Sequence, residues 1–280
     1  MLRPAGIDAA TAVLAWAGFL APEAEAAELA AAADDDAHLA AMVQRRTTGE
    51  PLAWITGTTT FCGETLRVDP GVYVPRPQTE PLARAAAGVL PRDGTAVDLC
   101  TGSGALAVVL ARQHPDARVI GTDLDPAAVR CARANGVEAY EGDLAAAAPS
   151  EVHGQVDLVT AVVPYVPSEA LHLLPRDVTA HEPRRALDGG THGTAILVRA
   201  VEAAAGLLRP GGHLVLELGG DQDRRLGATL ARLGFTGIRP HHDEDGDLRR
   251  LEARSPTHPG RRRSPDPNAT SGDTGSWRRG

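Results

Sequence analysis

Three aspartates, Asp98, Asp123 and Asp143, fall at or near the ends of predicted strands, around a glycine-rich loop. Asp98 lies near the end of the strand-like run 95–100, the loop that follows carries Gly102 and Gly104, and Asp123 ends the next strand. Two glycines let a backbone approach a ligand closely, and the N-terminus of the helix that follows offers free N–H groups and partial positive charge. The pattern Gly-x-Gly-x-x-Ala, taken alone, also fits a dinucleotide fingerprint.

The carboxylates favour a different ligand. Asp98 stands where dinucleotide-binding folds usually have an apolar residue, and a carboxylate there suits an ammonium group. Asp123 is placed to accept both hydroxyls of a ribose, and Asp143 to lie beside an adenine edge. A ligand with an amino acid at one end and a nucleoside at the other is S-adenosylmethionine. We therefore expect S-adenosyl-L-methionine as the cofactor, bound by Asp98, Cys100, Thr101, Gly102, Ser103, Gly104, Asp123, Asp143, Leu144 and Val162.

A second group of candidate residues lies in the segment TAVVPYVP, residues 160–167. The chain must leave the sheet near Pro164, because a proline cannot continue a buried strand ladder. Methyl transfer from a sulfonium is an in-line displacement that needs no metal, so the enzyme's main task is to hold the acceptor atom close and aligned. The candidates for this task are the residues of the loop, Val162, Val163, Pro164 and Tyr165, a role that the family resemblance given below implies.

Alternating strands and helices position these residues. Strand-like runs at 95–100, 117–123, 137–143, 155–162 and 211–219 are separated mainly by helix-like runs. This alternation predicts an α/β, Rossmann-like parallel sheet. Two final strands, 235–242 and 247–253, are close enough to pair as an antiparallel hairpin at one edge of the sheet.

Four regions follow from the patterning of the chain. Residues 1–50 predict a small helical domain, 51–77 a β-hairpin linker and 78–254 the catalytic domain. Residues 255–280 lack apolar periodicity and predict a disordered tail.

Composition excludes several classes of protein. The net charge of −8 argues against DNA as a partner, because phosphate binding needs a basic surface. Three widely spaced cysteines predict neither a disulfide framework nor a zinc site and favour the cytoplasm. No apolar run reaches the roughly 18 residues of a membrane span. We expect a monomer without a metal or a membrane anchor.

Five separated motifs, in order, resemble the HemK/PrmC family of protein-(glutamine-N5) methyltransferases. They are RRTTGEPLAWITG, VDPGVYVPRPQTE, DLCTGSGALAV, HEPRRALDGG and LVLELGGDQ. The resemblance implies a class I S-adenosylmethionine-dependent methyltransferase fold with an N-terminal domain that docks the substrate. It also implies the activity, methylation of the glutamine in the GGQ motif of peptide chain release factors. In such a site Arg76 and Glu80 are candidates for orienting the cofactor or the loop, and Glu182 and Arg184 for bracing the loop.

The chain departs from this family in the loop. The family's Asn-Pro-Pro-Tyr aligns with Val162 to Tyr165. Pro164 and Tyr165 match, whereas Val162 and Val163 replace the asparagine and the first proline. In the family, the asparagine oxygen and the next backbone carbonyl grip the amide N–H bonds, and the tyrosine packs against the amide. Losing one such hydrogen bond costs about 1–3 kcal/mol. Two alternatives stay open: another acceptor, such as a small molecule or a nucleic acid, and a catalytically impaired protein that binds the cofactor.

Overall fold

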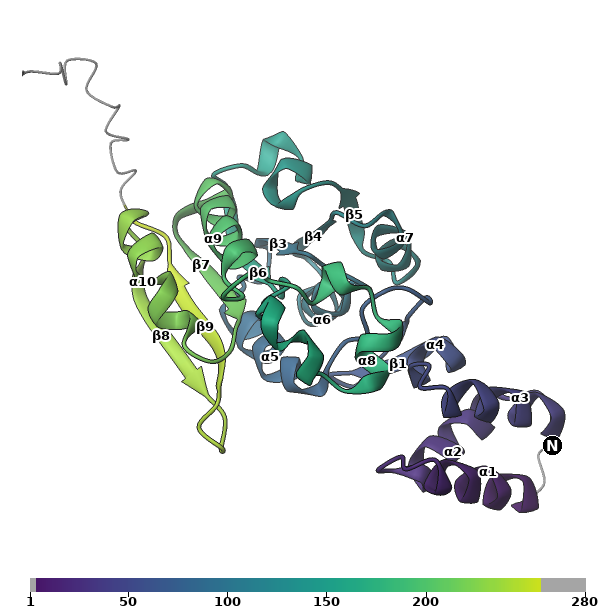
Figure 1. The fold of residues 1–280 in the computed structure, drawn as a ribbon. Coiled ribbons are helices and arrows are strands. Elements are labelled where there is room, and N and C mark those ends of the chain that lie inside the picture. Colours follow the sequence, from purple (N-terminus) through teal and green to yellow (C-terminus); the bar gives the residue numbers. More distant parts are fainter. Residues whose placement is uncertain (1–3, 258–280) are drawn as a thin grey trace, which may run out of the picture.

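The computed structural model describes residues 4–257, so most of the predicted tail lies outside the described residues. The chain begins with three helices, α1 (Pro4–Trp16), α2 (Pro22–Ala32) and α3 (Asp36–Thr47), which form a separate lobe at one end of the molecule (Figure 1). Leu14, Leu29 and Met42, one from each helix, are buried together in its core. Within residues 4–257 no helix is long and apolar enough to cross a membrane.

The linker differs from the predicted hairpin at its start. A short helix, α4 (Leu52–Thr56), precedes the antiparallel strands β1 (Thr58–Phe61) and β2 (Glu64–Arg67). The helix forms because Ile55 packs into the core of the N-terminal lobe, while the buried Trp54 donates a hydrogen bond to the Val72 carbonyl at 2.9 Å. Sequence periodicity missed it because five residues give little more than one helical turn.

A seven-stranded sheet forms the centre of the molecule, as predicted. The strand order is β5-β4-β3-β6-β7-β9-β8, parallel except for β9, which pairs antiparallel with both β7 and β8. Parallel strands place their carboxyl ends on one edge, which is where ligands bind in open α/β sheets. The strands are β3 (Thr95–Leu99), β4 (Arg118–Asp123), β5 (Glu138–Glu141), β6 (Val156–Ala161), β7 (Leu208–Glu217), β8 (Thr236–His242) and β9 (Leu248–Arg254).

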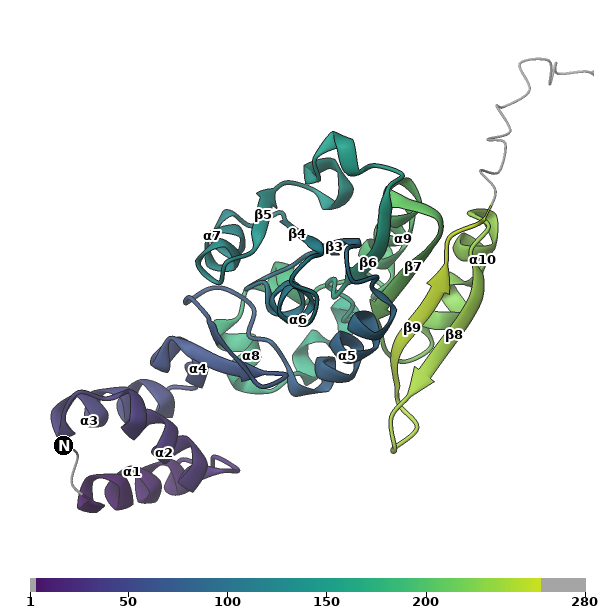
Figure 2. The same cartoon turned by 180° about the vertical axis from the view of Figure 1, so that it is seen from behind.

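Helices cover both faces of this sheet. α9 (Ala195–Leu207) and α10 (Gln222–Arg232) pack on one face (Figure 1), and α5 (Glu80–Val89), α6 (Ala105–Gln113) and α7 (Pro126–Ala134) on the other (Figure 2). Alternate residues of β3 serve the two cores, because successive side chains of a strand point to opposite faces. A shorter helix, α8 (Arg176–His181), lies in the segment between β6 and α9.

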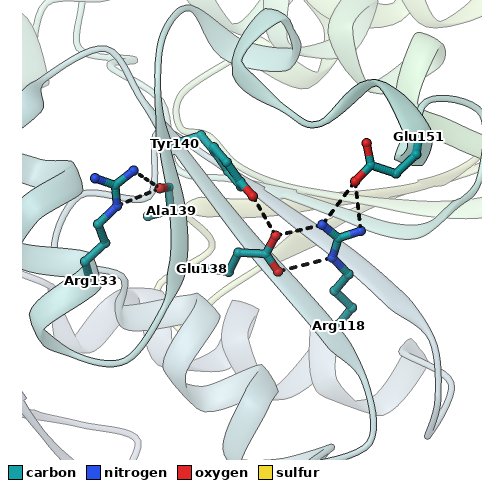
Figure 3. Close-up of polar contacts among 6 residues, drawn as sticks. All are labelled: Arg118, Arg133, Glu138, Ala139, Tyr140 and Glu151. Carbon is teal, nitrogen blue, oxygen red and sulfur yellow. Dashed lines mark hydrogen bonds and ion pairs between the residues drawn. The ribbon is translucent and has the colours of Figure 1, made fainter.

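Polar contacts fix the register of the edge strand β5 (Figure 3). Arg118 on β4 pairs with Glu138 on β5 at 2.7 Å, and the Tyr140 hydroxyl donates to the same carboxylate at 2.9 Å. On the helix side, the Arg133 guanidinium of α7 donates to the Ala139 carbonyl at 2.7 Å. These contacts hold the strand that leads into Asp143, one of the predicted site residues.

Candidate active site

One cavity of about 510 Å³ lies at the carboxyl ends of β3, β4 and β6. It is lined by every predicted site residue except Gly104. Gly104 instead starts α6 with a φ of 84°, and a Cβ there would lie 2.8 Å from the Val137 side chain. Gly104 thus lets the helix pack closely against its neighbours, and its assignment to cofactor binding stays a prediction.

The glycine loop turns sharply between β3 and α6. Cys100 and Gly102 both adopt a φ of 57°, in the left-handed region that disfavours side chains. The Thr101 N–H donates to the Thr122 carbonyl at 3.0 Å, and the Gly102 N–H donates to Asp123 Oδ2 at 2.9 Å. The loop is thus attached to the end of β4, and its backbone forms one wall of the cavity.

Asp98 is a buried carboxylate held by hydroxyl groups. Thr101 donates to Asp98 Oδ2 at 2.6 Å and Thr160 donates to Oδ1 at 2.7 Å. Burial raises the pKa of Asp98 to about 6, and the two hydroxyl hydrogen bonds work in the opposite direction. A ligand that brings a positive charge beside this group relieves the cost of burying its own negative charge. Asp98 therefore fits the ammonium group for which the sequence suggested it.

Asp123 is oriented by the backbone on both sides. Its Oδ2 accepts from Gly102, and its Oδ1 accepts from the Asp125 N–H at 2.9 Å. Burial raises the pKa of Asp123. Because each carboxylate oxygen has more than one lone pair, Asp123 keeps acceptor capacity for the hydroxyls of a ribose.

Two ion pairs close the rim of the cavity. Asp125 pairs with Arg185, and Asp143 pairs with Arg199 of α9. The carboxylate of Asp143 is thus already engaged by an arginine, which the sequence did not predict. These pairs neutralise the outer acidic groups and leave Asp98 and Asp123 as the inner ones. A cavity with two inner carboxylates fits S-adenosylmethionine, which carries a sulfonium and an ammonium group.

The loop 162–165 forms the wall next to this acidic region. Val162, Val163, Pro164 and Tyr165 all line the cavity, and Val163 is buried. The Tyr165 hydroxyl donates to Glu217 Oε1 at 2.9 Å. Residues 187–193 pack against the loop: the Val166 N–H donates to the Leu187 carbonyl at 3.0 Å, and a Cβ on Gly189 would lie 2.7 Å from the Pro164 carbonyl oxygen.

The other charged candidates divide into two groups. Arg76 forms an ion pair with the buried Glu182, and its guanidinium carbon lies 4.9 Å from the centre of the Tyr73 ring. This ion pair connects residue 76, just before α5, to residue 182, five residues before the segment 187–193 that packs against the loop. Glu80 pairs with Arg84, accepts from the Cys62 N–H at 2.9 Å and does not line the cavity, so its orienting role stays a prediction. Arg184 pairs with Asp188, which belongs to the segment 187–193 that packs against the loop.

Comparison with known proteins places this site in a family. A family described as "Methyltransferase domain" matches residues 96–181. The chain is 40% identical over 272 residues to a protein of Mycolicibacterium smegmatis named "Release factor glutamine methyltransferase", covering 88% of this chain and 95% of that protein. The chain belongs to the release factor glutamine methyltransferase family. A Geobacter sulfurreducens protein of the same name is 36% identical and covers 73% of each chain.

A third relative has a different acceptor in its name. The "4-amino-L-phenylalanine/4-methylamino-L-phenylalanine methyltransferase" of Streptomyces pristinaespiralis is 44% identical over 192 residues, covering 64% of this chain and 66% of that protein. Enzymes similar to this chain are thus named for a protein amide and for an aromatic amine.

In the described part of the chain, no three His, Cys, Asp or Glu side chains gather to hold a metal ion.

Proposed function

We propose that this protein transfers the methyl group of S-adenosylmethionine to the N5 side-chain amide nitrogen of a protein glutamine. The observation that carries the proposal is that one cavity holds both Asp98 and Asp123 and the loop Pro164–Tyr165. Family membership over nearly the whole chain supports the release factor GGQ loop as the substrate. When bound, the cofactor supplies an activated methyl group that needs no further activation by the protein.

The residues of the chain have separate tasks in this reaction. Asp98 binds the cofactor's ammonium group, and Asp123 accepts hydrogen bonds from its ribose. An amide nitrogen is a poor nucleophile, because its lone pair is delocalised into the carbonyl. The backbone carbonyl of Val163 grips an N–H of the glutamine amide, and the Tyr165 ring packs against the amide plane. Catalysis then consists of holding the nitrogen in line with the methyl group. The N–C bond forms as the S–C bond breaks, the thioether S-adenosylhomocysteine leaves, and one N–H proton of the amide is released to water.

The N-terminal lobe supplies the docking surface in this proposal. Trp16 is 92% exposed and Leu20 is fully exposed, and both lie in the lobe farthest from β8 (Figure 1). Contiguous exposed apolar area marks interaction surfaces, and these two side chains would supply such area to a docked substrate. We assign residues 1–50 to substrate docking, 51–77 to the linker and 78–254 to catalysis. The protein works as a monomer in the cytoplasm, where release factors act.

Labelled S-adenosylmethionine tests the proposal when it is incubated with the full chain and an intact release factor. The label should appear on the glutamine of the GGQ motif. No label on the release factor, with cofactor binding intact, would reject glutamine as the acceptor.

An aromatic amine is a second candidate acceptor, favoured by one observation. Val162 and Val163 line the cavity and present no side-chain hydrogen-bond acceptor to it. An aromatic amine has a more available lone pair than an amide and needs fewer acceptors to orient it. Turnover of 4-amino-L-phenylalanine in the same assay, with none on the release factor, would favour this second candidate.

A further inference from the structure

Tyr165 is held at two points by one short segment of the chain. Glu217 ends β7, and Gln222 begins α10, with only four residues between them. The side chains of both are buried, at 3% and 4% exposed. Glu217 Oε1 accepts a hydrogen bond from the Tyr165 hydroxyl at 2.9 Å, and Gln222 Nε2 donates one to the Tyr165 backbone carbonyl at 2.7 Å. The sequence motif LVLELGGDQ therefore touches both ends of the same residue.

The Gln222 amide is fully used in this contact. Its Oε1 accepts from the Gly219 N–H at 3.0 Å, which fixes which way the amide faces. Its Nε2 also donates to the Gly193 carbonyl at 3.2 Å. A Cβ on Gly193 would lie 2.0 Å from the Tyr165 carbonyl oxygen, so only glycine allows this close approach. Three segments thus meet at one backbone carbonyl.

The Glu217 contact fixes the ring rather than the backbone. Burial raises the pKa of Glu217, and hydrogen bonds from Thr79 and Tyr165 oppose the rise. Burial likewise raises the pKa of Tyr165, so the phenol keeps its proton and stays a donor. A buried phenol with a fixed acceptor has one favoured ring position. Because β6 and β7 are parallel neighbours, this bond spans the sheet edge between the loop and the adjacent strand end.

We propose that Glu217 and Gln222 are positioning residues that set the orientation of Tyr165 and of the loop carbonyls for methyl transfer. The inference rests on the proposed function for its kinetic readout alone. Neither residue lines the cavity, so neither contacts the cofactor or the acceptor directly. Both act through Tyr165, which does line it. Their removal should therefore change turnover rather than cofactor binding.

Kinetics on the release factor supply the first readout. Glu217→Ala should lower kcat about tenfold, the value of one hydrogen bond that aligns the reacting groups, and leave the KM for the cofactor within about twofold. Glu217→Gln should recover most of the loss, because its amide oxygen still accepts from the phenol. Gln222→Ala should also lower kcat, and Gln222→Glu should not recover it, because a carboxylate has no N–H to donate. Asp221→Asn, beside Gln222 and paired with Arg225, is the matched control.

Fluorine NMR supplies a readout that does not depend on the acceptor. The chain has three tyrosines, so fluorotyrosine labelling gives three resonances, and Tyr165→Phe identifies one of them. Glu217→Ala and Gln222→Ala should shift or broaden the Tyr165 resonance and leave that of Tyr140, on the edge strand β5 (Figure 3), unchanged. A Tyr165 resonance that does not respond would overturn the inference. So would variants that raise the cofactor KM while kcat stays constant.

The two readouts separate this inference from the proposed function. If wild-type protein leaves glutamine unmethylated while the Tyr165 resonance responds as expected, the acceptor is wrong and the positioning of the loop stands. If Glu217→Ala fails to fold, the two Gln222 variants decide the matter. Lower kcat in both supports the inference, and unchanged kcat in both overturns it.

Discussion

The Thr160 hydroxyl donates a hydrogen bond to Asp98 Oδ1 at 2.7 Å and so joins the two halves of the site. Asp98 belongs to β3, which leads into the glycine loop, and Thr160 belongs to β6, which leads into residues 162–165. The strands are paired in register at these two residues. The group that binds the cofactor and the loop that orients the acceptor therefore share one rigid pair of buried strands.

Asp123 offers a direct test of cofactor binding. Asp123→Ala should weaken the binding of S-adenosylmethionine by about 1–3 kcal/mol, because it removes the acceptor for the ribose hydroxyls. Calorimetry measures the change. Asp116→Ala is the matched control, since Asp116 is an exposed carboxylate paired with Arg92 outside the cavity. Equal affinities for the two variants, or a preference of the wild type for a nicotinamide dinucleotide, would contradict the assignment.

Asp98 predicts a pH dependence of cofactor binding. Its pKa in the folded protein is raised to about 6, so the carboxylate is charged above this pH and neutral below it. Only the charged form attracts an ammonium group, so affinity should fall as the pH is lowered through about 6. The folding stability of the ligand-free protein changes with pH in the opposite direction. A raised carboxyl pKa means that folding is relatively favoured as the pH falls from about 6 toward the unfolded value.

The variant Asp98→Asn isolates this effect. It should bind the cofactor more weakly at neutral pH and lose most of the pH dependence, as titrations between pH 5 and pH 8 would show. It should also unfold at a similar or higher temperature without ligand, because a buried charge has been removed. A variant that keeps the wild-type pH profile would assign the titration to another group.

The exposed apolar side chains of the N-terminal lobe predict a separation between docking and chemistry. The double variant Trp16→Ser and Leu20→Ser should raise the KM for an intact release factor about tenfold, because it removes apolar contact area from the docking surface. Turnover of a short GGQ peptide and cofactor binding should stay unchanged. Ile238→Ser, on the exposed strand β8 at the other end of the molecule, is the control. An unchanged KM would remove the docking role from this surface.

The two valines of the loop give the most informative substitution. Val162→Asn, alone or with Val163→Pro, should increase glutamine methylation by up to about a hundredfold, the value of one regained hydrogen bond in the transition state. Turnover should change more than cofactor affinity. If Val162 lines a pocket for another acceptor, the new amide would be buried without a partner and activity would fall on every substrate. Turnover of the GGQ glutamine and of an aromatic amine, measured for the single and the double variant, distinguishes these outcomes.

The sequence predicted the parts of this protein that depend on local pattern. Alternation of apolar runs and glycine positions was enough for the sheet, the loop after β3 and the acidic strand ends. It did not predict the helix α4, whose single turn is held by burial of Ile55 in the neighbouring lobe. Nor did it predict that Arg199, far along the chain, engages Asp143.

Glu217 and Gln222 show why the rest of the site could not be predicted in this way. They lie 52 and 57 residues from Tyr165, and their contacts with it exist only because β6 and β7 are neighbours. A signal for Glu217 was present, since a carboxylate ends an apolar strand there as Asp123 does. The predicted strand 211–219 placed Glu217 inside the run, and nothing in the local pattern indicated which residue it would meet.

The most direct measurement is mass spectrometry of the GGQ peptide from an intact release factor incubated with this protein and S-adenosylmethionine. The expected result is one methyl group on the glutamine side chain, lost in Tyr165→Ala and strongly reduced in Asp98→Asn. An unmodified glutamine, while the protein binds the cofactor and methylates an aromatic amine or no acceptor at all, would contradict the proposed activity.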